Sequence, residues 1–387
     1  MMVNVRVFRY CFYYSANSII MGSYMKPENL AICVDRYLPN SETFIFDRIR
    51  SFKHFNPVVI CRKDDYAAQF QWPYIFSYLR RKNKYNTYKK YVTSLIQENR
   101  ISLLQVHHSV NAFPLIRVAK KTRVPLITFF HGTDIYFFRG IFFRLRLKNL
   151  FHQGDYFVVN SDDMKKNIIK MGCNPSKIFT NTAGIDSNKF IPKDWSASIS
   201  ATFRMVMVGR FIEVKGLLYG IKAFKIFFDK HKTGSLTIIG DGELRKEYEK
   251  EAEGYPIVFM GMQPHQIVAE EIRKSDLVLI PSVFTKKGIP DSCNNVVKEA
   301  MACAVPVIAS RIAAIPEMVV NKETGLLFEE KNHTELALHI EFFFKNQPKL
   351  SEFGKKSYER FIKNYTLDAQ MKRLEELYVK IIRQYRI

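Results

Sequence analysis

Short apolar runs alternate with longer amphipathic stretches along nearly the whole chain of 387 residues. This alternation is typical of βα units around parallel sheets, because a strand that helices cover on both faces is apolar throughout. The predicted strands of a first set are Leu30–Val34, Pro57–Ile60, Ser102–Val106, Pro125–Phe130 and Tyr156–Val159. Those of a second set are Arg204–Val208, Leu236–Ile239, Ile257–Met260, Leu277–Ile280, Pro306–Ile308 and, more weakly, Gly325–Phe328. We therefore predict an α/β protein with two parallel sheets.

The stretch between the two strand sets, Ile191–Thr202, is rich in Pro, Ser and charge and has no useful periodicity. It predicts a linker at 191–203 between an N-terminal domain at 29–190 and a C-terminal domain at 204–365. Residues 1–28 are interpreted as an appendage, since the regular pattern starts only near Leu30. Residues 366–387 are predicted to form a C-terminal helix that packs back toward the N-terminal domain. Its apolar face comprises Met371, Leu374, Leu377, Tyr378 and Ile381.

The chain is strongly basic, with 59 Lys and Arg against 37 Asp and Glu and a net charge of +22. Residues 1–200 hold 30 basic and 13 acidic residues, whereas 201–387 hold 29 and 24. The hydrophobic share of 47% and charged share of 25% exclude a disordered or fibrous chain. The charge predicts an anionic partner, either nucleic acid, an anionic membrane or a phosphorylated substrate, attracted mainly by the N-terminal half.

The six cysteines form no C-x-x-C pair and have no histidine at zinc-site spacing. Neither a disulfide framework nor a metal site is predicted, and a reducing cytoplasm fits best. The longest early uncharged run, between Arg9 and Lys26, has 16 residues and includes several polar ones. A bilayer span needs about 20 apolar residues, so none is expected there, and a secretory signal is the weaker alternative.

A basic strand exit follows Arg204–Val208, where residues 209–216 read GRFIEVKG. Ligands of open parallel sheets bind beyond the carboxyl ends of the strands, so Gly209, Arg210 and Lys215 are expected to face one crevice. A guanidinium fork and an ammonium together suit a diphosphate, whose charge grows as it departs. The alternative is that both cations are solvated loop residues.

The next strand exit, after Leu236–Ile239, reads GDGE. Gly240 and Gly242 would let the backbone approach a ligand closely. The dinucleotide fingerprint is incomplete, because Arg245 stands where its third glycine belongs, and a plain tight turn is the alternative interpretation.

The longest informative segment, 281–310, reads as a loop, a helix from about Asn294, and a strand. If Asn294 or Ser292 caps that helix, its first amides can bind a phosphate. Asp291 and Glu299 would then line the crevice, where carboxylates accept hydrogen bonds from ribose and sugar hydroxyls. The alternative is that Asp291 caps the helix and Glu299 pairs with a lysine.

Two strand exits in the first half carry weaker signals. Pro125–Phe130 is followed by His131, Gly132 and Asp134, so the histidine and the aspartate could form a hydrogen-bonding pair that faces the cleft. A satisfied loop histidine is the alternative. After the first strand, Ser41 and Glu42 are candidates for acceptor binding, although a helix cap explains them adequately.

Together VGRFIEVKG, GDGE, the Asp291-to-Glu299 segment running into EAMACAVPVIAS, HGTD and PNSETFI resemble family 4 of the retaining GT-B glycosyltransferases. The resemblance covers most of 29–387, and PNSETFI and DSCNNVVKEAMA are most similar to bacterial enzymes of exopolysaccharide, capsule or lipopolysaccharide synthesis. It implies two facing Rossmann-like domains, an acceptor on the N-terminal one and a nucleotide diphosphate sugar on the C-terminal one, with no cofactor or metal at the diphosphate. The family's motif usually has Glu where this chain has Asp291, and its glycine-rich N-terminal loop is replaced by the Ser41-Glu42-Thr43 type.

Carried over by this resemblance, Arg210 and Lys215 would stabilise the departing diphosphate, with the amides of Asn295 and Val296 completing its cradle. Glu299 would accept hydrogen bonds from the ribose. Asp291 would hold donor-sugar hydroxyls, and His131 would meet that sugar from the opposite domain.

Two segments of the N-terminal half join aromatic residues to cations, Trp72–Tyr91 and Tyr136–Phe151. Both could lie in a lipid interface beside a lipid-linked acceptor, on a protein peripheral to the inner face of the plasma membrane. Core aromatics with solvated cations are the alternative. Rival functions are single-stranded nucleic-acid binding, for which no recognition module is visible, and an epimerase or glycoside hydrolase on the same fold.

Overall fold

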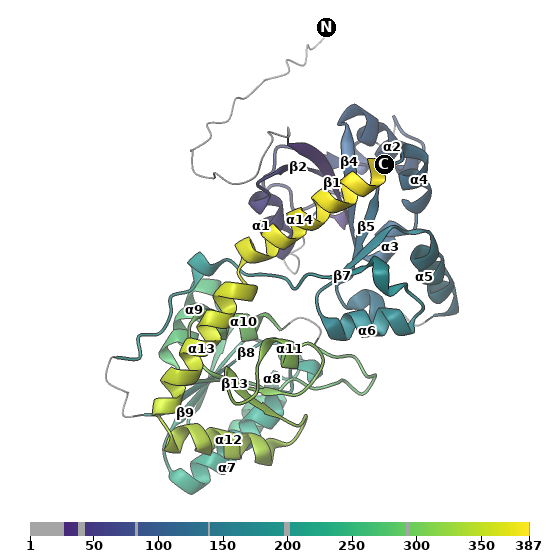
Figure 1. Cartoon of the computed structure of the whole chain (residues 1–387). Coiled ribbons are helices and arrows are strands. Elements are labelled where there is room, and N and C mark those ends of the chain that lie inside the picture. The colour runs from purple at the N-terminus through teal and green to yellow at the C-terminus, as the bar shows by residue number, and fades with distance from the viewer. Residues whose placement is uncertain are drawn as a thin grey trace.

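The computed structural model describes residues 27–37, 43–81, 84–137, 140–196, 202–291 and 294–386. It shows two lobes, each built on one parallel sheet, with a long C-terminal helix running from one lobe to the other (Figure 1). Ser41 and Glu42 lie outside the described residues. The predicted α/β class with two Rossmann-like sheets is confirmed.

The N-terminal sheet has seven strands in the order β3-β2-β1-β4-β5-β6-β7. These are β1 (Glu28–Arg36), β2 (Phe55–Lys63), β3 (Ile75–Ser77), β4 (Ile101–His107), β5 (Leu126–Phe129), β6 (Tyr156–Val159) and β7 (Ile178–Thr180). The helices of this lobe are α1 (Thr43–Ser51), α2 (Tyr88–Glu98), α3 (Ser109–Ala112), α4 (Ile116–Thr122), α5 (Ile141–Gln153) and α6 (Asp162–Lys170). A π-helical turn spans Thr133–Phe137.

The C-terminal sheet has six strands in the order β10-β9-β8-β11-β12-β13. They are β8 (Arg204–Val208), β9 (Ser235–Ile239), β10 (Ile257–Gly261), β11 (Leu277–Ile280), β12 (Val307–Ser310) and β13 (Gly325–Phe328). The helices that follow are α7 (Leu217–His231), α8 (Arg245–Ala252), α9 (His265–Lys274), α10 (Asn295–Ala302), α11 (Ile315–Met318), α12 (His333–Lys345), α13 (Pro348–Asn364) and α14 (Leu367–Arg386).

Both sheets reverse their strand order once, between β1 and β4 and between β8 and β11. This is the doubly wound order in which ligands bind at the reversal point, beyond the carboxyl ends of the strands. Alternate residues of each strand pack into separate apolar clusters on the two faces. In β1, Ala31 and Cys33 pack on one side, and Leu30, Ile32 and Val34 on the other.

Helix α14 begins at the C-terminal lobe and covers one face of the N-terminal sheet (Figure 1). Its residues Met371, Leu374, Tyr378 and Ile381 are buried with strand residues of β1 and β2. Glu375 accepts hydrogen bonds from the backbone amides of Lys53 and His54 at 2.7 and 2.9 Å. The last helix of the chain therefore belongs to the core of its first lobe.

Two short strands were not predicted. The three-residue strands β3 and β7 are the outermost strands of the N-terminal sheet. Three residues are too few for a periodic pattern, and an outermost strand pairs on one side only, so the local sequence carries little signal. Strand β3 lies within Trp72–Tyr91, where Tyr91 is fully buried and Tyr78, Tyr85 and Tyr88 pack around it. Core packing therefore explains these tyrosines.

Candidate active site

The reversal point of the C-terminal sheet brings together three of the predicted residues. Lys215, in a 3-10 turn after β8, lies with its Nζ 2.8 Å from Oδ2 of Asp291, which follows β11. The side chain of Lys215 is 16% exposed and that of Asp291 is 10% exposed. Glu299, one turn into α10, lies close enough for the charge of Lys215 to favour its ionised form. The predicted alternatives, Asp291 as a helix cap and Glu299 paired with a lysine, are not what the structure shows.

The carboxylate of Asp291 is held at one oxygen only. Oδ2 accepts hydrogen bonds from Lys215 Nζ, Ser282 Oγ at 3.1 Å and Asn294 Nδ2 at 2.9 Å. Oδ1 accepts none from the residues that the structure describes. Asp291 thus has one oxygen anchored to the protein and one available to a hydroxyl donor.

Glu299 is 6% exposed, and its carboxylate has no hydrogen-bond partner among the described parts of the chain. Burial raises the pKa of Glu299, although the positive charges of His265, Lys298 and Lys215 oppose this rise. A buried carboxylate without a partner is costly unless a ligand satisfies it. This residue is therefore suited to accept hydrogen bonds from a ligand hydroxyl.

Arg210 lies at the exit of β8, six residues after Arg204, and is exposed. It has no ion pair with another described residue, unlike Lys215. Its guanidinium is therefore available to an anion that enters above this strand. Arg210 lies at the same sheet edge as Lys215, and no ion pair with a described residue fixes the direction of its side chain.

Gly209, Gly240 and Gly242 are used to pack loops against one another. A Cβ at Gly240 would overlap the carbonyl oxygen of Gly209, and one at Gly242 would lie 2.7 Å from the carbonyl oxygen of Phe211. Phe211 also bonds through its N–H to the carbonyl of Asp241 at 2.8 Å. Gly240 and Gly242 thus fit the predicted alternative, a tight turn, and set the position of the Arg210 loop.

Helix α10 begins with Asn295 and Val296, the predicted phosphate cradle. Asn294 occupies the N-cap position, but its side chain donates to Asp291 and Ser282 and accepts nothing from the helix. The side chains from Val296 to Ala302 are all buried, so α10 is held firmly in the lobe.

In the N-terminal lobe, His131 is half-buried beyond the end of β5, beside Phe44. Asp134 is fully enclosed, and its Oδ1 accepts from both the N–H and the Oγ of Ser109 at 2.8 Å. Burial opposes its charge, yet hydrogen bonds from His108 and Ser109 outweigh burial and lower the pKa of Asp134. The carboxylate of Asp134 therefore holds the loop together, and its contact with an acceptor stays a prediction.

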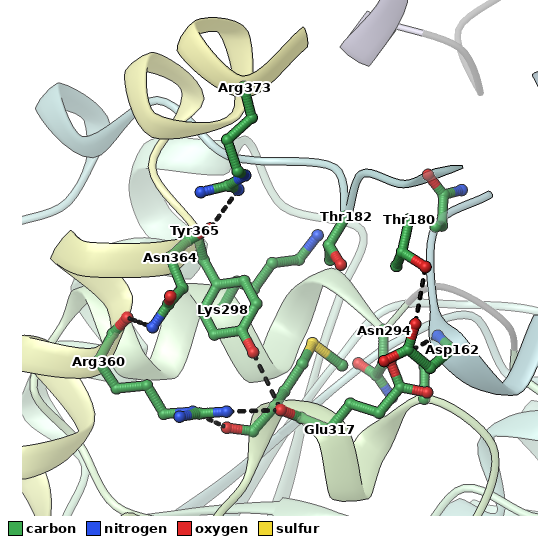
Figure 2. A pocket seen from close by; sticks show the side chains of 13 residues that line it. Asp162, Thr180, Thr182, Asn294, Lys298, Glu317, Arg360, Asn364, Tyr365 and Arg373 are labelled. Atoms are coloured by element: carbon green, nitrogen blue, oxygen red, sulfur yellow. Dashed lines mark hydrogen bonds between the residues drawn. The ribbon is translucent and has the colours of Figure 1, made fainter. Parts of the chain in front are cut away.

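A cavity of about 280 Å³ lies between the lobes. Figure 2 shows the side chains that line it. Its walls carry amide, hydroxyl and charged groups from both lobes: Asn160, Asp162, Thr180, Thr182, Asn294, Lys298, Ala314, Glu317, Met318, Arg360, Asn364, Tyr365 and Arg373. None of the predicted site residues is among them. The cavity adjoins the site through α10, whose Lys298 faces it while Glu299, the next residue, does not.

Two contacts beside this cavity join the lobes. Glu317 accepts hydrogen bonds from the backbone amides of Asp162 and Asp163, at the start of α6, at 2.8 and 2.7 Å. The buried Lys298 donates to the carbonyl oxygen of Ala183 at 2.6 Å. Neither residue had been singled out from the sequence, because each acts on a segment more than 100 residues away.

His107 and His108 were also missed, although ligands of such sheets bind beyond the carboxyl ends of the strands, where these two residues lie. They follow the predicted strand Ser102–Val106 directly, at the reversal point of the N-terminal sheet. Nδ1 of His107 lies 2.8 Å from Nε2 of His131, and Nδ1 of His108 lies 3.2 Å from Oδ2 of Asp134. His131 is therefore part of a histidine cluster rather than a lone loop residue.

Comparison with known proteins places this chain in a family. The family described as "Glycosyl transferases group 1" matches residues 196–360, and "Glycosyltransferase Family 4" matches residues 52–189. The chain belongs to the family 4 glycosyltransferases. This confirms the family resemblance, and each of the two matched segments covers most of one lobe.

Among curated relatives, the amylovoran biosynthesis glycosyltransferase AmsK of Erwinia amylovora is 29% identical over 57% of this chain and 56% of its own length. WcaL of Escherichia coli (strain K12), named for colanic acid biosynthesis, is 27% identical over 57% and 55%. The chain thus matches little more than half the length of these relatives. Among solved structures, HepE of Anabaena in complex with UDP has a TM-score of 0.75 at 16% identity, covering 91% of this chain and 100% of that one.

Proposed function

We propose that the chain is a retaining hexosyltransferase that moves a sugar from a nucleotide diphosphate sugar to a growing, lipid-linked cell-surface glycan. The observation that carries this proposal is the cluster at the reversal point of the C-terminal sheet. There Lys215 and Asp291 are paired at 2.8 Å beside the buried carboxylate of Glu299, which has no hydrogen-bond partner among the described residues. Such a cluster matches a ligand with an anionic part and a hydroxyl-bearing part.

The diphosphate would lie above the end of β8, where Lys215 and Arg210 supply positive charge and the first amides of α10 supply donors. The leaving group gains charge as the sugar departs, so these donors stabilise the transition state more than the ground state. We propose that the protein cations fill this role without a metal ion. Glu299 would accept from the ribose, and the available Oδ1 of Asp291 would accept from the donor sugar.

His131 would meet the donor sugar from the N-terminal lobe, where the acceptor also binds. AmsK and WcaL are named for amylovoran and colanic acid biosynthesis, and CapM of Staphylococcus aureus for capsular polysaccharide biosynthesis. These names support an acceptor of the exopolysaccharide, capsule or lipopolysaccharide kind. HepE has been solved with UDP and with UDP-glucose, which supports a uridine diphosphate sugar as the first donor to test.

The test of donor binding is a thermal-shift panel of nucleotide diphosphates and their sugars. A ligand that binds only the native state raises Tm with its concentration, by about 2.7 kcal/mol of stability at 100 times Kd. At least one of these ligands is expected to raise Tm of the wild type, and Glu299→Ala is expected to remove most of that shift. If no nucleotide raises Tm while oligonucleotides bind with a steep salt dependence, the proposal is wrong and the nucleic-acid alternative holds. Retention is then checked from the anomeric configuration of the product by NMR.

The lipid-linked acceptor and a membrane site are supported by helix α5. Its apolar residues Ile141, Phe142 and Leu145 are 67%, 80% and 56% exposed and fall within about 100° of one another around the helix. Leu147 and Phe151, which are buried, lie on the opposite face.

The cations of α5 flank its exposed apolar face. Arg144 and Lys148 lie on one side of that face and Arg146 on the other, and the helix has no acidic residue. Apolar side chains bordered by cations suit the headgroup region of an anionic bilayer. No helix among the described residues is both long and apolar enough to cross a bilayer.

Vesicle sedimentation tests this surface, with anionic and with purely zwitterionic vesicles. The wild type is expected to bind the anionic vesicles, and Phe142→Asp to weaken binding at least tenfold, since a charge replaces a side chain that enters the interface. Leu338→Asp, at a residue of α12 that is 59% exposed, is the matched control and is expected to bind like the wild type. Equal binding of Phe142→Asp and the wild type would contradict the assignment to α5.

A further inference from the structure

A line of hydrogen-bonded polar side chains runs from the C-terminal helix α14 to His131 through the core of the N-terminal lobe. The hydroxyl of Tyr378, in α14, donates to Oε1 of Gln105 at 2.6 Å. Nε2 of Gln105 lies 2.7 Å from Nε2 of His107, whose Nδ1 lies 2.8 Å from Nε2 of His131. Tyr378, Gln105 and His107 are all fully buried, so water does not compete for these bonds.

The placement of the Gln105 amide group sets the direction of every bond in this line. The Oε1 of Gln105 is taken by Tyr378, so its NH₂ group faces His107, and an amide nitrogen can only donate. His107 must then accept at Nε2, and a neutral imidazole that accepts at one nitrogen carries its proton on the other. The Nδ1–H of His107 donates to Nε2 of His131, and His131 must in turn carry its proton on Nδ1.

The two imidazole rings have the geometry that this bond requires. Their planes differ by 8°, and their centroids are 5.0 Å apart. Because the two nitrogens are 2.8 Å apart while the ring centroids are 5.0 Å apart, the two nearly parallel rings meet edge to edge. The Nδ1–H of His107 therefore points along the lone pair on Nε2 of His131. Face-to-face stacking would not bring the nitrogens into line.

We propose that Tyr378, Gln105 and His107 are positioning residues that hold His131 as its Nδ1–H tautomer, so that it meets the substrate as a hydrogen-bond donor and not as a general base. The role at the substrate rests on the proposed function. The tautomer itself follows from the bonds within the protein. Free histidine in water favours the other tautomer, so the line of bonds is what selects this one.

The surroundings keep both rings neutral, as this scheme requires. Burial, together with the charges of Arg48 and His108, lowers the pKa of His107 well below its ordinary value. Burial and the neighbouring His107 and His108 lower the pKa of His131 in the same way, although Asp134 acts in the opposite direction. The backbone N–H of His131 is held separately by Oδ2 of Asp134 at 3.3 Å.

The direct test is a long-range ¹H–¹⁵N spectrum of the full chain labelled at histidine, with His131 assigned through a His131→Asn variant. His131 is expected to show a protonated Nδ1 and an unprotonated Nε2. A protonated Nε2 would overturn the proposal, whatever the enzyme's activity. The tautomer is read from the wild type, and the His131→Asn variant serves only to assign the signal.

The role of the line itself is tested by Tyr378→Phe, which keeps the aromatic ring but removes the hydroxyl. The side-chain amide of Gln105 is then free to exchange the positions of its oxygen and nitrogen. His131 is expected to become a mixture of tautomers, and turnover with the donor found by the thermal-shift panel to fall about tenfold, equal to about 1.4 kcal/mol. Tyr156→Phe is the matched control, because Tyr156 also bonds a glutamine of α14, Gln384, but at the surface and away from the histidines.

An unchanged His131 signal in a folded Tyr378→Phe variant would overturn the role of Tyr378, and so would an equal effect of Tyr156→Phe. If no nucleotide sugar supports transfer by the wild type, the proposed function fails. The tautomer of His131 is still decided by the spectrum. The two failures are therefore distinguishable.

Discussion

At the scale of single residues, the site contains one ion pair and one carboxylate without a partner among the residues that the structure describes. Asp291 orients Lys215 through Oδ2 and is itself oriented by Ser282 and Asn294. Glu299 has no such support from the described chain; burial raises its pKa, and the nearby His265, Lys298 and Lys215 oppose that rise. Binding of a ligand with hydroxyl and phosphate groups would satisfy both features at once.

Replacement of Lys215 by Ala is expected to lower turnover at least about 10²-fold, or about 3 kcal/mol, because the lysine acts on charge that develops in the transition state. Arg210→Ala is expected to act in the same direction. Lys246→Ala, at an exposed lysine of α8, serves as the control and should leave turnover unchanged. The measurement is the initial rate of sugar transfer at saturating donor, and equal rates for Lys215→Ala and Lys246→Ala would contradict the assignment.

The buried histidines predict a loss of stability below neutral pH. His107 and His131 resist protonation in the folded state, whereas in the unfolded chain they bind protons near the ordinary pKa of 6.5. The unfolded state therefore binds more protons below pH 6.5, and the free energy of unfolding falls as pH falls, by at most about 1.4 kcal/mol per pH unit for each histidine.

Denaturant unfolding between pH 7.5 and 5.5 measures this slope. His107→Gln is expected to reduce it relative to the wild type, whereas His54→Gln, at an exposed histidine, should not. Glu299 and Glu317, whose folded pKa values are raised, act in the opposite direction closer to pH 4.5. An equal slope in wild type and His107→Gln would show that the folded protein protonates His107 as readily as the unfolded chain does.

At the scale of elements, the site depends on how closely two loops approach each other. Gly216 has a φ of +60°, and a Cβ there would overlap the carbonyl oxygen of Pro281, in the loop after β11. The backbone N–H of Val283 also donates to the carbonyl of Val214 at 3.0 Å. The loop that carries Lys215 is thus in direct contact with the loop that carries Asp291.

Gly216→Ala is expected to destabilise the C-terminal lobe through two effects. The left-handed conformation costs about 1 kcal/mol for alanine, and displacement of the Pro281 carbonyl adds about 1 to 3 kcal/mol. Gly254→Ala is the control, since Gly254 has a φ of +81° but no described atom within 4 Å of where the alanine methyl group would lie. Thermal unfolding of the two variants separates the effects, and similar losses in both would contradict the close approach of the loops.

At the scale of the whole molecule, the two lobes are joined by side-chain contacts and by the C-terminal helix. Glu317 and Lys298 bond to backbone of the N-terminal lobe, and a bridge between Ile185 and Thr366 holds the start of α14. Tyr378 ties α14 to the histidine cluster. Helix α14, which runs between the lobes, therefore also contacts the histidine cluster.

Leu374→Ala is expected to destabilise the N-terminal lobe by about 2 to 5 kcal/mol, although residue 374 lies near the C-terminus, because its fully buried side chain fills the core below β1 and β2. Hydrogen exchange of the amides of β1 should accelerate. Leu338→Ala, at an exposed leucine, is expected to change stability by less than about 0.5 kcal/mol. Faster exchange in the C-terminal strands with none in β1 would contradict this packing.

Buried parallel strands were recognisable from local sequence. The predicted bounds of β6, β8, β11 and β13 agree with the structure at both ends, because each is a continuous apolar run between polar turns. The same reasoning found the strand exits that carry Lys215, Asp291 and Glu299, since chemistry in such sheets gathers beyond the carboxyl ends of the strands.

Other features depended on contacts between residues far apart in the chain. The bond from Tyr378 to Gln105 spans 273 residues, and the enclosure of Asp134 depends on Ser109, 25 residues before it. The segment Trp72–Tyr91 and the apolar face of α5 have similar local composition, yet Tyr78, Tyr85 and Tyr88 pack in the core with Tyr91 whereas the face of α5 is exposed. Local periodicity reports which face of an element is apolar, whereas the folded arrangement determines what lies against that face and which polar groups meet without water.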